Sequence, residues 1–374
     1  MKKITILLSH LPNPRILKKV KALEEDFNIN IIYWDRGHDI KESFYINPKN
    51  TVKAINIKSI RSRGIGKLWS LYRYKNRAMD ELRKEDPHII HALNMDMLFI
   101  ARSYKKRYKS HVKLVYEVGD LPKYSFQKNI RSLKGIVYKA LQYIERSLCR
   151  DISKLIVTSP YFWDEYFSKF LSKDKYIFVP NTPYKKDFEN YRKKQAGDFT
   201  IGFIGSIRYK DQLKMLIDSV EDLDSGMKVF LAGSGPSYEE IYDYSRDKDF
   251  VEFYGPYNYD REIASLYGKV DCTYSVYDNQ LENVKIALPN RLYESVVCQL
   301  PIIVAKDTKL SEFVLDEGIG ISVSPYDRED LKAGLEVLTK RDKIKSIEEN
   351  SRRIKDDYYY ENNVEKLKNI YLGL

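Results

Sequence analysis

Short apolar runs alternate with segments of helical periodicity along most of the chain. In the first half, the apolar runs predict strands at 3–9, 30–34, 88–92, 113–118, 154–158 and 176–179. Residues 131–149 instead carry apolar side chains three or four positions apart, which predicts an amphipathic helix. Strands that alternate with helices are typical of a parallel sheet covered by helices.

The same alternation restarts in the second half, after a polar and basic segment at 186–198 that we predict to be a linker. It predicts strands at 200–204, 227–232, 251–254, 270–275 and 301–305, and helices at 212–223, 261–267 and 290–298. The expected fold is therefore α/β, with two doubly wound, Rossmann-like parallel-sheet domains, 1–185 and 199–354, facing each other across a cleft. A closing helical segment, 355–374, could cross back to the first domain.

Charge is distributed unevenly between these two halves. The 374 residues carry a net charge of +11, but residues 1–200 hold 41 Lys and Arg against 21 Asp and Glu, whereas residues 201–374 hold 23 against 32. The excess is steepest at 61–150, with 21 against 8 and tyrosines interleaved. A basic half beside an acidic one favours an anionic partner for the first domain: a phosphorylated substrate, an anionic membrane surface or nucleic acid. A solvated lysine-rich surface is the alternative.

Cysteine usage and hydropathy narrow the class of protein. Cys149, Cys272 and Cys298 are far apart and form no Cys-x-x-Cys pair, so neither a disulfide framework nor a zinc site is indicated, and a reducing cytoplasm fits. The first apolar run is too short for a signal peptide, since it is broken near Pro12. No stretch approaches the roughly 18 apolar residues of a membrane span, so we expect any membrane contact to be peripheral.

The segment 205–210, Gly-Ser-Ile-Arg-Tyr-Lys, directly follows the first strand of the second domain and precedes a helix. Backbone amides and a helix N-terminus at such a turn favour anions, and Arg208 and Lys210 could together hold a diphosphate. Solvated loop cations are the alternative interpretation.

A second glycine-containing turn, Gly233-Ser234-Gly235-Pro236, follows the next predicted strand. Ligands of open α/β sheets bind at the carboxyl ends of the strands, so this turn is also a candidate binding loop. It lacks the third glycine of a dinucleotide fingerprint, which disfavours an NAD-dependent enzyme.

The block 281–294 carries a third candidate. Pro289 and Asn290 suit the start of a helix whose free amides would point at a ligand. Glu294, one turn later, could accept hydrogen bonds from two hydroxyls of a ribose or sugar ring. The alternative for Glu294 is a solvated carboxylate that stabilises the helix dipole.

Taken together, these blocks resemble the nucleotide-sugar-binding half of retaining glycosyltransferases of the GT-B fold, family 4 type. The resemblance lies in 205–210, 233–236, the strand Val251-Glu252-Phe253-Tyr254-Gly255, and above all Ala287-Leu288-Pro289-Asn290-Arg291-Leu292-Tyr293-Glu294 followed by Leu300-Pro301-Ile302-Ile303. It implies transfer of a hexose-type sugar from a nucleotide diphosphate sugar to an acceptor hydroxyl, with retention. The implied acceptor is a lipid-linked glycan or a polysaccharide precursor, and the implied location is cytoplasmic and peripheral on the inner face of the membrane.

The resemblance implies roles for individual residues. Arg208 and Lys210 would bind the donor diphosphate and stabilise the charge on the leaving group, the amides of 290–292 would bind the same phosphates, Glu294 would bind the ribose, and His91 would act near the acceptor. The implied donor-binding residues are Gly205, Ser206, Gly233, Gly235, Tyr254, Gly255, Asn283, Pro289, Asn290, Arg291, Leu292 and Glu294. The acceptor-side candidates are His10, Asn13, Arg15 and Asp120. For His91 the alternative is a buried, hydrogen-bonded histidine, and strand alternation places His88 on the opposite face, against a two-histidine metal site.

Three positions depart from the family pattern. Ile286 stands where the family has a second glutamate, so contacts to the donor sugar must differ or come from Asn283 and nearby backbone. The first strand is not followed by the expected glycine pair, and Gly119 stands where many members carry histidine.

No cofactor or metal is expected. The leaving diphosphate can itself take the acceptor proton, and the Asp-x-Asp pairs at 222–224 and 247–249 fall at a predicted helix end and in a charged loop. Two other functions remain open. A nucleotide-sugar epimerase of the same fold would need no acceptor, and a non-enzymatic nucleic-acid-binding protein would use the basic, tyrosine-rich stretch for stacking.

Overall fold

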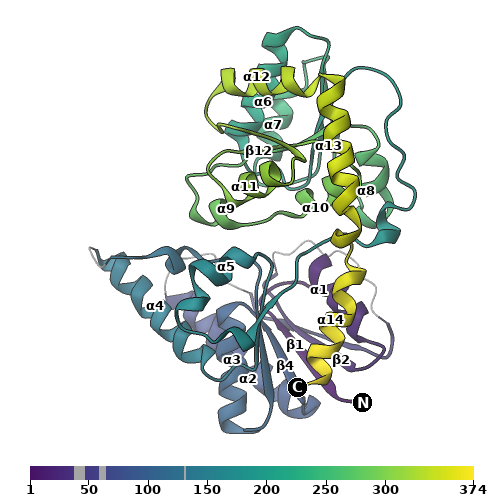
Figure 1. The fold of residues 1–374 in the computed structure, drawn as a ribbon. Helices are drawn as coiled ribbons and strands as arrows, with labels where there is room; N and C mark the ends of the chain where they lie inside the picture. Colours follow the sequence, from purple (N-terminus) through teal and green to yellow (C-terminus); the bar gives the residue numbers. More distant parts are fainter. Residues whose placement is uncertain (38–46, 59–64, 130–131) are drawn as a thin grey trace. The chain divides into compact units, whose positions relative to one another are not determined.

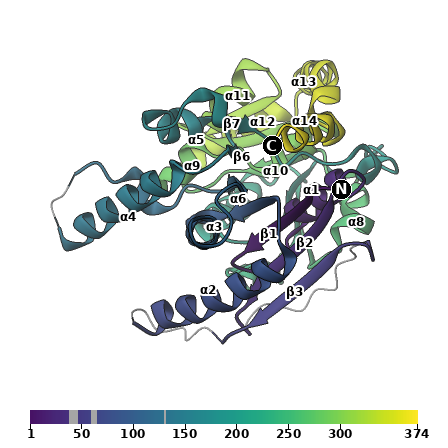
Figure 2. The same cartoon turned by 90° about the horizontal axis from the view of Figure 1, so that it is seen from below.

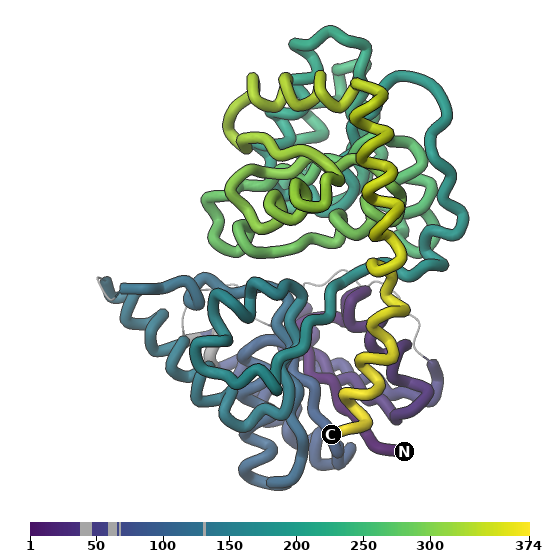
Figure 3. The backbone as a smooth tube through the Cα atoms, viewed as in Figure 1, coloured from purple at the N-terminus to yellow at the C-terminus, as the bar shows by residue number. Residues whose placement is uncertain are grey.

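The computed structural model describes residues 1–37, 47–58, 65–129 and 132–374. The chain forms two compact units, residues 1–180 with 363–374 and residues 181–362. Figure 3 traces the path of the chain between them. The segment 186–198, for which we predicted a linker, lies within the second unit, where Lys194 forms an ion pair with Asp271.

The first unit is built on a parallel seven-stranded sheet of order β3-β2-β1-β4-β5-β6-β7 (Figure 1). The strands are β1 (Lys3–Leu8), β2 (Asn28–Asp35), β3 (Thr51–Asn56), β4 (Ile89–Leu93), β5 (Lys113–Val118), β6 (Lys154–Val157) and β7 (Tyr176–Phe178). Its helices are α1 (Pro14–Leu23), α2 (Ile65–Glu85), α3 (Asn94–Arg107), α4 (Leu133–Cys149), α5 (Pro160–Glu165) and most of α14 (Glu361–Leu372).

The second unit holds a parallel six-stranded sheet of order β10-β9-β8-β11-β12-β13. Its strands are β8 (Thr200–Ile204), β9 (Lys228–Ala232), β10 (Val251–Gly255), β11 (Cys272–Ser275), β12 (Ile302–Ala305) and β13 (Gly320–Val323). Its helices are α6 (Lys210–Leu223), α7 (Tyr238–Ser245), α8 (Tyr259–Tyr267), α9 (Glu282–Ile286), α10 (Asn290–Val297), α11 (Lys309–Asp316), α12 (Arg328–Leu338) and α13 (Arg341–Ile354). Apolar side chains of α6, α7 and α12 cover one face of the sheet, and those of α8, α10 and α11 lie in the clusters of the other.

The predicted strands are all present, and the doubly wound α/β class is confirmed in both units. Two strands were missed, β3 and β13, and each lies at one of the two edges of its sheet. In both sheets the chain order reverses once, at β1/β4 and at β8/β11, and such a switch point opens a crevice at the carboxyl ends of the strands. These two carboxyl edges are therefore the expected ligand-binding edges of the two sheets.

The closing helix α14 packs in the first unit, beside α1 (Figure 1). Lys368 Nζ lies 3.1 Å from Glu25 Oε2, and the buried Tyr371 ring meets Phe27 edge-on. Within the described residues, no helix combines the length and the apolar character needed to cross a bilayer.

Candidate functional site

Three loops interlock at the carboxyl edge of the second sheet. The Gly205 amide, just after β8, donates a 2.8 Å hydrogen bond to the Ala232 carbonyl at the end of β9. The Gly233 amide in turn donates a 2.7 Å hydrogen bond to the Gly255 carbonyl at the end of β10. The turns at 205–210 and 233–236 and the end of β10 are thus joined by backbone hydrogen bonds into one surface.

Glycines are required here because the loops touch backbone to backbone. Gly205, Gly233 and Gly235 have φ of +137°, +141° and +159°, where side chains are disfavoured. A Cβ on Gly233 would lie 1.8 Å from the Gly205 carbonyl oxygen, and one on Gly235 would lie 2.4 Å from that of Ile207. These glycines therefore fix the shape of the surface on which a donor would rest.

Arg208 and Lys210 present the positive charge of this surface. Both side chains are exposed, and Arg208 Nε donates a 2.9 Å hydrogen bond to Ser206 Oγ. Lys210, the first residue of α6, lies 3.1 Å from Glu240 on α7, a partner that the sequence did not indicate. Because solvent screens an exposed ion pair, this lysine can exchange Glu240 for a phosphate at small cost.

Arg291 crosses beneath the switch point between β8 and β11. Its Nε donates a 2.9 Å hydrogen bond to the Ile204 carbonyl at the end of β8, and its Nη1 donates one of 2.7 Å to the Tyr274 carbonyl in β11. The guanidinium carbon lies 3.9 Å from the centre of the Phe203 ring. The side chain is therefore a buried cross-link, and only the Arg291 amide can serve the predicted donor contact.

Helix α10 begins at Asn290 on the same edge, after Pro289, and has no side-chain cap. The first amides of a helix lack intrahelical acceptors, and the helix dipole makes this end positive. The Leu292 amide already donates a 3.1 Å hydrogen bond to the Pro289 carbonyl. The amides of Asn290 and Arg291 are thus the better placed of the three predicted phosphate ligands.

Glu294 is buried rather than solvated, so the interpretation of a surface carboxylate is wrong. Tyr259 and Tyr267, at the two ends of α8, donate hydrogen bonds of 2.8 and 2.7 Å to its two oxygens. Burial, followed by the charge of Glu294, raises the pKa of Tyr267 well above its usual value. Each carboxylate oxygen retains a further lone pair for a ligand hydroxyl. Neither tyrosine was predicted, because no local pattern links α8 to α10.

The other donor candidates lie around this edge. Tyr254 is exposed and its hydroxyl donates to Glu262, while Asn283 is partly exposed on the short helix α9. Ile286, at the position of the missing second glutamate, is buried. A buried apolar side chain therefore stands at the position where the resemblance implies a carboxylate.

In the first unit, the candidates surround the carboxyl edge of β1 and β5. Asn13 is the N-cap of α1, where its Oδ1 accepts a 3.1 Å hydrogen bond from the Ile16 amide. His10 lies in the loop after β1, with Nδ1 2.7 Å from the Leu11 carbonyl oxygen. Asp120 is exposed just beyond β5. The Asn13 side chain thus has a structural partner, which its sequence position did not reveal.

His91 lies fully buried on β4 between two partners. Its Nε2 is 2.8 Å from Glu117 Oε2 on β5, and its Nδ1 is 2.7 Å from the Tyr371 hydroxyl on α14. The ring therefore cannot touch a dissolved acceptor unless this cluster moves.

Glu117 is the centre of that cluster and is itself fully buried. Lys19 Nζ and Arg15 Nε, both from α1, lie 3.1 and 3.2 Å from its Oε1. Burial alone would raise the pKa of Glu117, but Lys19, His91 and Arg15 together hold it well below its usual range. This cluster was not predicted from the sequence, although Glu117, a charged residue in a largely apolar strand, is a signal that could have indicated it.

Arg15 also explains the departure at position 119. A Cβ on Gly119 would lie 2.0 Å from Arg15 Nη1, so the guanidinium fills the space beside this glycine. The Arg15 side chain is 17% exposed, which leaves part of it open at the edge of the unit. In this chain a cation therefore stands beside the position at which the family pattern has histidine.

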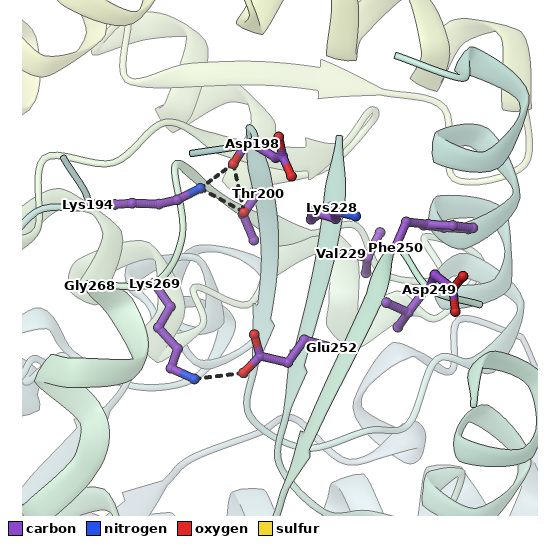
Figure 4. Close-up of a pocket in the computed structure, with 11 residues that line it drawn as sticks. Lys194, Asp198, Thr200, Lys228, Val229, Asp249, Phe250, Glu252, Gly268 and Lys269 are labelled. Atoms are coloured by element: carbon purple, nitrogen blue, oxygen red, sulfur yellow. Dashed lines mark hydrogen bonds and ion pairs between the residues drawn. The ribbon is translucent and has the colours of Figure 1, made fainter. Parts of the chain in front are cut away.

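Two other features of the chain concern ligand binding. Asp222 of the first Asp-x-Asp pair lies 2.6 Å from Arg328, and within the described part of the chain no cluster of three or more His, Cys, Asp or Glu side chains is arranged to hold a metal ion. Figure 4 shows a hollow lined by both lysines and acidic residues at the amino ends of β8, β9 and β10. It lies at the opposite edge of the sheet from Gly205, Gly233 and Gly255, and Lys269 in it already pairs with Glu252.

Comparison with known proteins finds a family match that lies within the second unit. Residues 185–354 match the family described as glycosyl transferases group 1. The chain is 28% identical over 276 residues to the succinoglycan biosynthesis protein ExoL of Rhizobium meliloti, covering 70% of this chain and 66% of that protein, just under two thirds of its length.

Two solved structures superpose on the whole length of this chain. Sucrose-phosphate synthase from Thermosynechococcus elongatus superposes with a TM-score of 0.75 at 14% identity, over 100% of this chain and 99% of that one. Anabaena Alr3699/HepE in complex with UDP-glucose superposes with a TM-score of 0.67 at 13% identity, over 100% of both chains. The protein thus has the GT-B fold, and its residues 185–354 resemble glycosyl transferases group 1.

Proposed function

We propose that the protein transfers a hexose-type sugar from a nucleotide diphosphate sugar to an acceptor hydroxyl, with retention of anomeric configuration. The observation that carries the proposal is the edge formed by the glycine loops, the exposed Arg208 and Lys210, and the start of α10. It supplies cations, free amides and a helix dipole to one anion, on a domain of the group 1 family.

In the proposed reaction the acceptor oxygen forms a bond to the anomeric carbon while the bond from that carbon to the diphosphate breaks. The acceptor proton passes to an oxygen of the departing diphosphate, so no separate base is required. Arg208 and Lys210 stabilise the charge that grows on the diphosphate, and Glu294 holds the ribose hydroxyls. We propose that this chemistry needs no metal, and full turnover in excess EDTA is the expected result.

We further propose that the first unit binds the acceptor, a lipid-linked glycan or polysaccharide precursor, at the inner face of the membrane. His10, Asn13, Arg15 and Asp120 are the acceptor-side residues, and His91 acts as a positioning residue through Glu117 and Arg15. Support comes from the basic first half and from the role in succinoglycan biosynthesis that the name of the relative states.

The test combines ligand binding with turnover. A thermal-shift screen against nucleoside diphosphates identifies the donor, because a ligand at about 100 times its Kd stabilises the folded state by about 2.7 kcal/mol. With that donor, Arg208→Ala and Lys210→Ala should each lose about 10²-fold in rate, or about 3 kcal/mol. Lys214→Ala is the matched control, since Lys214 lies one turn further along α6 and also pairs with Glu240, at 2.8 Å.

Wild-type rates for both variants would refute the roles of Arg208 and Lys210. Consumption of the sugar nucleotide without any acceptor would indicate an epimerase. Salt-dependent oligonucleotide binding without binding of any sugar nucleotide would indicate a nucleic-acid-binding protein.

A further inference from the structure

Helix α4 of the first unit faces the wrong way for an ordinary surface helix. Its most apolar side chains point to solvent: Leu133 is 84% exposed, Tyr143 72%, and Ile136 53%, with Val137 and Ile144 also exposed. These positions recur at the spacing of one helix face, so they form a continuous apolar stripe. Of the apolar residues whose periodicity predicted this helix, only Leu148 is buried.

Polar side chains hold the helix in this orientation. Glu145 is fully buried, and Tyr116 of β5 and Tyr166 both donate hydrogen bonds to it, the latter at 2.7 Å. Gln142 is also buried and donates a 2.7 Å hydrogen bond to the Tyr124 carbonyl. Rotating α4 to bury its apolar stripe would break all of these bonds, and an unpaired buried carboxylate is costly. The exposed stripe is therefore built into the fold.

Cations flank the stripe. Lys134 and Lys139 lie on either side of it on the helical wheel, Arg146 follows near its end, and Glu145, the one acidic residue of α4, points inward. An apolar face bordered by lysine and arginine is typical of helices that lie in the interface of an anionic bilayer. Figure 2 shows the N-terminal half of α4 running outward beyond α3 of the same unit.

We propose that the exposed face of α4, comprising Leu133, Ile136, Val137, Tyr143 and Ile144 with Lys134 and Lys139, inserts into the interface of an anionic membrane. The charge of the face selects a bilayer with negative headgroups over a second copy of the chain, because two copies would bring their lysines together. The inference rests on the proposed function in one respect: a lipid-linked acceptor would be reached at the membrane surface.

The structure offers a direct probe of this contact. All three native cysteines are buried, so an environment-sensitive thiol dye attached to Ile136→Cys reports on α4 alone. We expect its emission to shift to the blue with vesicles of phosphatidylcholine and phosphatidylglycerol, and much less with phosphatidylcholine alone. Leu315→Cys on α11 of the second unit is the matched control, since Leu315 is 54% exposed, and its label should not shift.

Vesicle sedimentation then measures the contribution of the stripe. The double variant Ile136→Gln/Val137→Gln should lose about tenfold or more in partitioning, because two apolar side chains no longer enter the bilayer. Leu315→Gln should bind as wild type does. Circular dichroism checks that the exposed substitutions leave the fold intact.

Three outcomes would overturn the inference: no shift at position 136 with anionic vesicles, wild-type partitioning of the double variant, or a concentration-dependent shift without vesicles, which would indicate self-association. None of these measurements involves the donor. A variant that fails to bind vesicles but still binds its nucleoside diphosphate would separate membrane docking from the proposed glycosyl transfer.

Discussion

The guanidinium of Arg15 takes the space that a side chain at Gly119 would need, with Nη1 2.0 Å from the ideal Cβ position. Arg15 reaches this place from α1. Its Nε lies 3.2 Å from Oε1 of Glu117 on β5, the strand that ends directly before Gly119. The two residues therefore determine each other: glycine at 119 permits the arginine, and the arginine supplies the cation beside it.

This relationship predicts that Gly119→Ala acts mainly through Arg15. The clash falls on the far end of a flexible side chain, so we expect a loss of stability of about 1 kcal/mol or less, while displacement of the guanidinium raises the KM for the acceptor. Arg15→Ala should raise the same KM, and the double variant should be no worse than Arg15→Ala. Additive losses in the double variant would show that the two positions act separately.

A second prediction concerns the glycine loops of the second unit. Gly233→Ala places a Cβ against the Gly205 backbone, which cannot move aside, so we expect a loss of several kcal/mol and of donor binding. Gly226→Ala is the control, because Gly226 also has a positive φ, +75°, but has open space around it. Gly226→Ala should lower the free energy of unfolding, measured by thermal unfolding, by only about 1 kcal/mol. Equal losses would mean that backbone conformation, rather than contact between the loops, demands glycine at 233.

Glu294 is predicted to recognise ribose hydroxyls. Glu294→Gln should weaken binding of the preferred nucleoside diphosphate by about tenfold or more, since it removes a charged hydrogen-bond acceptor. For the 2′,3′-dideoxy analogue, the wild type and the variant should bind almost equally. If the variant lost affinity equally for both ligands, the carboxylate would act by positioning α8 and α10 through Tyr259 and Tyr267 instead.

Glu117 gives the first unit a defined response to acid. Its pKa is lowered in the folded state, so its contribution to stability is present above its unfolded pKa of about 4.3 and is lost as the pH falls through the lower folded value. Glu117→Gln should remove this dependence and cost about 3–5 kcal/mol at neutral pH, because it leaves Lys19 buried without its counter-charge.

Urea unfolding followed by tryptophan fluorescence measures this effect in the first unit alone, since Trp34, Trp69 and Trp163 all lie there. Glu145→Gln is the matched control: burial raises the pKa of Glu145, so neutralising it should cost much less at neutral pH. Equal losses for the two variants would contradict the opposite pKa shifts of the two carboxylates.

Local patterns determined the strands that lie inside the sheets. An apolar run such as that of β1 or β8 reflects burial on both faces, and it can be recognised without knowing its neighbours. The edge strand β3 escaped prediction because most of its side chains are exposed, so it carries no such run. The sequence likewise placed Gly205, Gly233 and the start of α10 correctly at strand and helix ends, since turn chemistry is local.

Contacts between distant segments decided the rest. The sequence predicted α4 as an amphipathic helix, but only the tertiary structure showed that its apolar face is outward, because the tyrosines around Glu145 come from other elements. The burial of Glu294 likewise depends on a distant residue, because its hydrogen-bond partner Tyr267 lies 27 positions earlier in the sequence. His91 meets Tyr371 across 280 positions. Periodicity specifies which residues share a face, whereas the direction of that face depends on partners that only the folded chain brings together.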